Sequence, residues 1–252
     1  MTQQVLQTVA VLLLVPACCT LAVAQDYYWE TVTGIDDSSA PVAKTFYAPK
    51  KLKYVSAKED DPTIIVRMDR GTVLVVNARR ETFAEVSYAD WKSMRGQQNA
   101  LVFQIPPDVQ KLPDEQRERR VRELMATQLS ANRNVEVVRS AETKFVHGYS
   151  CSKYTVKQEN RAVLILWSTR AVKEFEHMRD DLAEAYRQLS LNHPALRMLP
   201  DALKSIDGFP MEYRVGEEKT TVQKIEKRIW GEDVFEAPSG FKRTTPAVAG
   251  QQ

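Results

Sequence analysis

The chain has 252 residues, of which 43% are hydrophobic and 27% are charged, and these values are typical of a globular protein. Its 35 basic and 33 acidic side chains leave a net charge of +2. This close balance gives no electrostatic reason to expect a nucleic acid partner, which normally needs a clustered basic face.

Residues 1–24 predict a secretory signal peptide. They contain no charged side chain, Val9–Ala17 forms an apolar core, and Ala22–Ala24 provides a small-residue cleavage site. The apolar run is shorter than the about 20 residues of a membrane-spanning helix, so no transmembrane segment is expected after cleavage. We therefore expect a periplasmic or extracellular protein. The alternative, a lipoprotein anchored at Cys18, is less favoured because Pro16 fits such a cleavage site poorly.

The remaining chain predicts one domain over residues 25–246. Its first part contains three strand signals, Asp26–Ile35, Lys44–Tyr47 and Leu52–Ser56. Pro49 has no backbone N–H and therefore belongs at the end of a strand rather than within a hydrogen-bonded ladder.

Residues 63–88 predict three neighbouring strands at the centre of the fold. Thr63–Asp69 and Thr72–Asn77 are rich in Val, Ile and Thr, and Glu81–Tyr88 follows after another short turn. Gly71 provides the positive φ that the first turn needs. Loops this short join antiparallel strands, because a parallel return needs a crossover of about a dozen residues or more.

Residues 89–130 predict a helical excursion from the sheet. A short helix is expected at Ala89–Gly96, and a longer one begins at Pro113 with acidic residues in its first turn and continues to Ser130. Arginines and glutamates alternate along this second helix. We interpret that pattern as a solvated helix face rather than a phosphate-binding surface.

Strands resume from Val135, as VEVVRSAETKFV, YSCSKYTVKQ and AVLILWS. The last of these is apolar on both faces, with Val163, Ile165 and Trp167 on one and Leu164 and Leu166 on the other. An antiparallel strand with one wet face should instead alternate apolar with polar residues. These strands therefore predict a sheet that is covered on both faces or that curls around an interior.

The strongest helix signal in the chain is Ala171–Leu191. Apolar residues recur there at steps of three and four, as Val172, Phe175, Met178, Leu182, Ala185, Tyr186 and Leu189. A helix of this length is marginal alone in water, so its apolar stripe must dock on the sheet.

The chain ends with a shorter helix and a hairpin. The helix runs from His193 to about Lys204, and Gly208 terminates it. Met211–Val215 and Thr220–Ile229 then predict a hairpin that forms the last pair of the sheet. Residues 247–252 predict a flexible tail.

No catalytic or metal-binding motif is evident. The three histidines lack metal-ligand spacing, and there is no C-x-x-C, phosphate-binding glycine loop or nucleophile elbow. His147 and Cys151 are the one candidate pair for a cysteine enzyme. The favoured interpretation of Cys151 is a small core residue, because an unperturbed thiol is mostly protonated at neutral pH. We expect no enzymatic activity, no metal and no cofactor.

Five segments occur in a characteristic order: Ile65–Gly71, Gly148–Tyr154, Leu166–Ser168, Gly208–Pro210 and Phe235–Phe241. Together they resemble an uncharacterised family of exported bacterial proteins, a domain of unknown function whose members look like the LolA and LolB lipoprotein-carrier half-barrels. The resemblance implies an α+β fold that is mainly antiparallel β. Its strongly curved half-barrel sheet would have about eleven strands, with helices packed in the concave face.

These observations predict a non-enzymatic envelope protein that shelters a hydrophobic ligand, such as a lipid or a lipidated peptide, between sheet and helices. The residues expected to line the site are Phe175, Met178 and Leu182 from the helix and Val75, Leu164 and Leu166 from the strands. The alternative is an interaction or envelope-assembly module without a ligand cavity, whose partner is another envelope protein. The first hypothesis requires an enclosed cavity, and the second an exposed apolar patch larger than a few hundred Å².

Overall fold

The computed structural model describes residues 26–34, 41–94, 109, 112–120, 135–189 and 194–245. The predicted signal peptide, with Cys18, and the predicted tail lie outside these residues. Of the predicted helical excursion 89–130, residues 89–94, 109 and 114–120 are helical and residues 112–113 are not, and the rest lies outside the described residues. None of the described helices is both long enough and apolar enough to span a membrane.

The strands of the first half are β1 (Asp26–Gly34), β2 (Val42–Ala48), β3 (Lys51–Val55), β4 (Thr63–Arg67), β5 (Thr72–Asn77) and β6 (Thr82–Ser87). Those of the second half are β7 (Val135–Val146), β8 (Tyr149–Gln158), β9 (Arg161–Thr169), β10 (Phe209–Val215), β11 (Glu218–Arg228) and β12 (Lys242–Arg243). The helical elements of this half are α4 (Phe175–Leu189), the 3₁₀ helix η1 (Pro194–Met198), α5 (Leu199–Ser205) and the 3₁₀ helix η2 (Glu232–Phe235).

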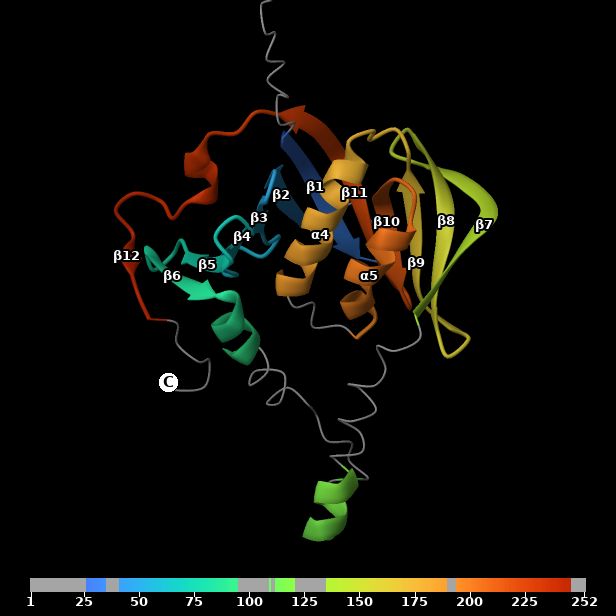
Figure 1. Cartoon of the computed structure of the whole chain (residues 1–252), viewed down its shortest axis with the longest axis horizontal. Helices are drawn as coiled ribbons and strands as arrows, with labels where there is room; N and C mark the ends of the chain where they lie inside the picture. Colours follow the sequence, from blue (N-terminus) through green and yellow to red (C-terminus); the bar gives the residue numbers. More distant parts are fainter. Residues whose placement is uncertain are drawn as a thin grey trace, which may run out of the picture.

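The twelve strands of the described residues belong to one unclosed, curved sheet with the order β12-β6-β5-β4-β3-β2-β1-β11-β10-β9-β8-β7. Helices α4 and α5 lie in its concavity (Figure 1). Neighbouring strands are antiparallel, except that β12 runs parallel to β6. The fold is therefore mainly antiparallel β and consistent with the expected α+β half-barrel. The sheet has one strand more than expected because the C-terminal segment adds β12, which is two residues long.

The predicted meander forms as β4, β5 and β6, and Gly71 takes a φ of 64° in its first turn. Its strands are covered on both faces. Val66 and Val73 are buried in the main core beneath the helices, whereas Ile65 and Leu74 are buried on the opposite face against Phe235. The C-terminal segment around η2 thus closes the convex side of the meander, which explains the apolar pattern on both faces of these strands.

Strand β9 has the same pattern for a different reason. Leu164 and Leu166 are buried in the main core, but Trp167 is only partly buried. The Nζ atom of Lys144 lies 4.4 Å from the centre of the Trp167 ring, and that of Lys153 lies 5.8 Å from it. Two lysine side chains therefore cover this ring through cation–π contacts. In the meander, by contrast, the C-terminal segment covers the same face of the sheet.

The predicted final hairpin forms as β10 and β11, but its expected place at the end of the sheet is wrong. Strand β11 pairs with β1 from Asp26 opposite Arg228 to Gly34 opposite Lys219. The hairpin consequently lies in the middle of the sheet, and the edges are β7 and β12. The partners are about 200 positions apart in the sequence, so no local pattern announces their pairing.

Helix α4 docks on the sheet as predicted, although it begins at Phe175 rather than at position 171. The four residues before it form turns, in which the N–H of Ala171 donates to Thr169 Oγ1 at 3.2 Å. Phe175, Met178 and Leu182 are each 1% exposed and belong to the main core. The apolar stripe therefore faces the concave side of the sheet.

Two acidic residues anchor α4 at its sides. Glu174, just before the helix, accepts hydrogen bonds from the Tyr27 hydroxyl and from Lys227. Asp181, which is buried, accepts from the Tyr47 hydroxyl at 3.1 Å and from the backbone N–H and Nζ of Lys50 at 2.8 Å and 2.7 Å. A buried carboxylate is tolerated when it is hydrogen-bonded in this way, so Asp181 fixes the helix against the β2–β3 hairpin.

Replacing Gly208 with alanine is expected to destabilise the protein more than replacing Gly71. Gly208 has a φ of 99°, and an added Cβ would lie 2.3 Å from the carbonyl oxygen of Thr169. At Gly71 an added Cβ would meet nothing within 4 Å, so that substitution costs only left-handed strain, about 1–2 kcal/mol. Urea unfolding of the two variants measures the difference, and equal losses would contradict the clash at Gly208.

Acid is expected to weaken the anchor at Glu174. Hydrogen bonds from Lys227 and Tyr27 lower the pKa of Glu174 from its ordinary value of 4.5 to about 2. Because the folded-state pKa is depressed, the stability that this carboxylate contributes is present above pH 4.5 and is lost as the pH falls toward 2.

Glu174→Gln should therefore lose less unfolding free energy between pH 4.5 and pH 2 than the wild type does. Glu176→Gln is the matched control, because Glu176 is exposed on the first turn of the same helix. Denaturant unfolding at a series of pH values measures both. An acid response of Glu174→Gln identical to that of the wild type would argue against the anchor.

Candidate functional site

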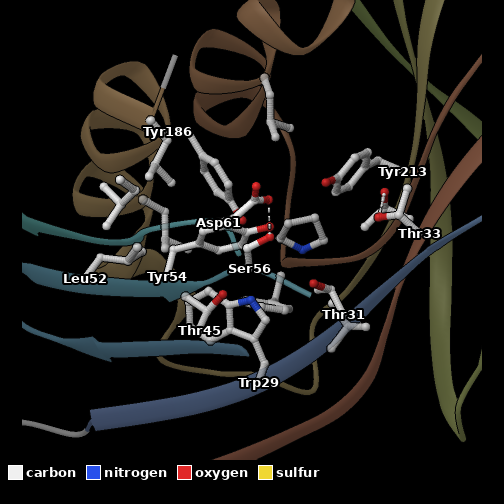
Figure 2. A pocket seen from close by; sticks show the side chains of 18 of the residues that line it. Trp29, Thr31, Thr33, Thr45, Leu52, Tyr54, Ser56, Asp61, Tyr186 and Tyr213 are labelled. Atoms are coloured by element: carbon white, nitrogen blue, oxygen red, sulfur yellow. Dashed lines mark hydrogen bonds between the residues drawn. The ribbon is translucent and has the colours of Figure 1, made fainter. Parts of the chain in front are cut away.

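A cavity of about 420 Å³ lies between the concave face of the sheet and the helices. Its volume is within the range of about 300–1,000 Å³ that is typical of small-molecule sites. Strands β1, β2, β3, β4, β10 and β11 form its floor, and α4 and α5 contribute to its cover (Figure 2). At the β3–β4 loop the cavity is bordered by Ser56 and by the exposed residues Asp61 and Pro62, which place its mouth there.

The inner wall of the cavity is apolar and buried. Trp29, Leu52, Leu182, Leu199, Phe209 and Val222 are each at most 5% exposed. The rings of Trp29 and Phe209 meet edge to face with their centres 5.5 Å apart. Such a wall offers contact surface to an apolar group of a ligand.

The sheet also lines the cavity with two cross-strand rows that carry hydroxyl groups. In one row Tyr213, Thr220 and Thr33 are paired across β10, β11 and β1. The hydroxyls of Thr33 and Thr220 lie 2.8 Å apart. In the other row Thr45 lies between Trp29 on β1 and Tyr54 on β3. Residues directly opposite each other in antiparallel strands share a face, so pairing alone brings these side chains together.

Three tyrosines keep their hydroxyl protons in this setting. Burial raises the pKa of Tyr54, Tyr186 and Tyr213, and the neighbouring tyrosines raise the pKa of Tyr186 further by charge repulsion. A raised pKa leaves each phenol neutral at physiological pH, where its O–H can donate a hydrogen bond and its oxygen can accept one.

The cavity is nearly free of charge among its described residues. Asp61 is the one charged side chain among the described lining residues, and it accepts a hydrogen bond of 2.6 Å from the Ser56 hydroxyl (Figure 2). No lysine, arginine or histidine occurs among the described lining residues. In the described part of the chain, no three His, Cys, Asp or Glu residues are grouped so that they could hold a metal ion.

Five of the six residues predicted for the site belong to the main core and Val75 packs against it, but only Leu182 is in the described wall of the cavity. Phe175, Met178, Leu164 and Leu166 are buried, whereas Val75 is partly buried at the margin of the same core. The centre of the Phe175 ring lies 6.1 Å from that of Phe209, so Phe175 supports the wall from behind. The structure thus brings the predicted residues together, and a direct ligand contact by them stays a prediction.

The wall residues that the sequence analysis missed carry two signals. Tyr186 and Leu189 continue the α4 stripe from Leu182 at helical spacing, toward the C-terminal end of the helix. Trp29, Thr31 and Thr33 alternate along β1 with a period of two, which places them on one face of the sheet.

Cys151 is a core residue rather than an exposed nucleophile. It is 1% exposed, and its Sγ lies 3.4 Å from the carbonyl oxygen of Tyr149. Burial raises the pKa of the Cys151 thiol to about 11, so it is almost entirely protonated at neutral pH. His147 is exposed in the β7–β8 turn with a φ of 45°.

The model of one protein family, described as Domain of unknown function (DUF4412), matches residues 116–241, which is half of the chain. This match agrees with the predicted resemblance to a domain-of-unknown-function family. The further likeness to the lipoprotein carriers stays a prediction. No curated protein matches the sequence.

Solved structures align with most of this chain at low identity. Two structures of PNGF-II, in space groups C2 and P21, cover 88% of it with 10% identity and a TM-score of 0.41. A chain of the Pseudomonas aeruginosa MucA/MucB complex covers 85% of it with 11% identity and a TM-score of 0.34. The present chain spans 31% and 32% of the two PNGF-II chains and 56% of the chain from the complex.

Met178→Trp is expected to destabilise the protein by about 1–3 kcal/mol, the usual cost of overpacking a filled core. Met178 is 1% exposed and lies outside the described cavity wall, so there is no room for the indole. Urea unfolding measures the loss. Unchanged stability would show that free space extends beside Met178 and that the predicted site reaches this residue.

Proposed function

For a chain that belongs to the DUF4412 family, a domain of unknown function, we propose a non-enzymatic role. In this proposal the protein is exported and shelters one hydrophobic ligand, such as a lipid or a lipidated chain, in the cavity between sheet and helices. The observation that carries the proposal is the cavity of about 420 Å³ with its buried apolar inner wall. Export rests on the signal-peptide pattern of residues 1–24.

Packing physics supports an occupant for this space. Protein interiors are close-packed, and voids larger than a water molecule are few. Side chains that face a void, as Trp29 and Leu182 do here, lose the dispersion contacts that neighbouring atoms would supply. An acyl chain entering the cavity would restore those contacts and would be removed from water at the same time.

The absence of catalysis is part of the proposal. The buried, protonated thiol of Cys151 supports it, because a cysteine enzyme attacks through the thiolate. Ser56 is paired with Asp61 at the mouth, and no histidine occurs among the described lining residues to serve as its base.

The alternative of an interaction module has less support. It requires an extended apolar patch on the surface. Among the described residues the exposed large hydrophobic side chains are Phe145, near the end of β7, and Ile229, just after β11.

Trp29 provides a direct test of the cavity. A brominated fatty alcohol that enters it should quench the fluorescence of Trp29, which lies in the wall. Trp91, Trp167 and Trp230 are not among the described lining residues. Quenching should therefore be largely lost in Trp29→Phe, and an equal response of this variant would place the bound probe elsewhere.

Thr31→Phe should block binding by filling the cavity from β1. Thr31 is half-buried and borders the cavity (Figure 2), so the ring enters free space and the unfolding free energy should change little. Affinity for the probe should fall by about tenfold or more, or about 1.4 kcal/mol.

Thr155→Phe is the matched control for Thr31→Phe. Thr155 is also half-buried on a strand but lies outside the described lining. Its substitution should leave quenching of Trp29 unchanged. The proposed function is wrong if wild-type protein shows no quenching at saturating probe, or if Thr31→Phe and Thr155→Phe bind equally well.

A further inference from the structure

We propose that the cavity selects amphiphiles whose polar group is uncharged and bears hydroxyl or ester oxygens, such as a fatty alcohol or a monoacylglycerol, over anionic lipids of the same chain length. The inference rests on the proposed function, because it names the class of ligand that the same cavity takes. It is carried by the hydroxyl rows of the sheet and by the lack of basic groups among the described lining residues.

The row across β10, β11 and β1 supplies paired polar groups to the lining of the cavity, from the buried Thr220 to the exposed Thr33. Tyr213 and Thr220 are opposite each other, and the Tyr213 hydroxyl is hydrogen-bonded to Thr220. Thr220 is in turn opposite Thr33, with their hydroxyls 2.8 Å apart. A hydroxyl has one proton and two lone pairs, so a connected row retains spare capacity for a hydroxyl or an ester oxygen of a ligand.

The second row and α4 add further groups of the same kind. Thr45 and Tyr54 are opposite each other on β2 and β3, and Tyr186 faces the cavity from the helix (Figure 2). A ligand in this space therefore meets an apolar inner wall and neutral hydroxyls. This combination complements a molecule with an acyl chain and an uncharged polar end.

An anionic polar group finds no such complement. Moving a carboxylate or phosphate out of water is unfavourable unless a cation or several hydrogen bonds replace the lost hydration. The described lining contains no cation, and its one charged residue, Asp61, has the same sign as the ligand would have. Desolvation of the anionic group is therefore the main cost, because the repulsion from the exposed Asp61 is screened by water.

A cationic amphiphile is also disfavoured relative to a neutral one. Asp61 is exposed, and its carboxylate already accepts the hydrogen bond from Ser56. An ion pair formed in such an exposed position contributes little to affinity. Thr45 and Thr220, by contrast, are buried, so water competes less for the hydrogen bonds of their hydroxyls.

The test is a competition experiment on the exported protein with four ligands that share a ten-carbon chain. Monodecanoyl glycerol, decanol, decanoate and decyltrimethylammonium are titrated at pH 8 against a brominated fatty alcohol, and recovery of Trp29 fluorescence reports displacement. We expect the two neutral ligands to bind about tenfold or more tightly than either charged one. Equal or tighter binding of decanoate or of decyltrimethylammonium would overturn the inference while leaving the proposed function standing.

Failure of the proposed function has a different signature. In that case the brominated probe does not quench Trp29 at all, and both the proposed function and the inferred ligand class are wrong. If the probe quenches Trp29 but the affinities do not follow the expected order, only the inferred ligand class is wrong.

Tyr213→Phe and Thr220→Val test the hydroxyl row itself, because both variants keep the shape of the side chain. Each substitution should lower the affinity for monodecanoyl glycerol about three- to tenfold, the usual effect of one hydrogen bond. The affinity for 1-bromodecane, which has no hydroxyl or ester group, should stay the same. Tyr149→Phe is the matched control, since Tyr149 lies outside the described lining of this cavity. A uniform loss for both ligands would show that the row only supports the fold and would overturn the inference.

Discussion

The pairing of β1 with β11 is the interaction on which the rest of the structure depends. Without it, strands β1–β6 with β12 and strands β7–β11 would form two separate sheets. The pairing places Trp29 opposite Ile225 and Thr33 opposite Thr220, and so brings residues from both ends of the chain to one concave face. Because loop-closure entropy grows only slowly with length, a pairing across about 200 residues is thermodynamically affordable, but such contacts slow folding.

The convex side of the sheet depends on a second long-range contact. Arg67 is 2% exposed and would be costly to bury alone. Its guanidinium donates to Asp69 and Glu236, and one N–H reaches the Phe235 carbonyl oxygen at 3.3 Å. Two of these partners belong to the C-terminal segment, so the ion pairs and the buried Phe235 ring hold that segment over the meander together. The apolar residues on this face of β4 and β5 are therefore buried by the C-terminal segment of the same chain.

Local features could be predicted from the sequence, and long-range ones could not. The meander, the turn at Gly71 and the buried stripe of α4 follow from periodicity and turn chemistry within short windows, and they were predicted. The position of β11 depends on a partner that no local pattern identifies.

The cavity was missed for another reason. Periodicity shows which face of a helix is buried, but it does not show whether the opposing surface fills the space, so Met178 and Leu182 looked equivalent. Threonines such as Thr33 were missed as site residues because threonine is also a common strand former.

The anchors of α4 explain why the space opens where it does. Glu174 and Asp181 tie the first half of the helix to β1, β2 and β11 and to the β2–β3 hairpin, and there the core is filled around Phe175 and Met178. The second half carries Tyr186 and Leu189 and faces strands on which threonine and tyrosine are six of the twelve residues that line the cavity. Threonine side chains are short and therefore fill less of the space between sheet and helix than the larger side chains of Phe175 and Met178 do in the filled half. The short threonine side chains that leave space between sheet and helix therefore also contribute hydroxyl groups to the lining of the cavity.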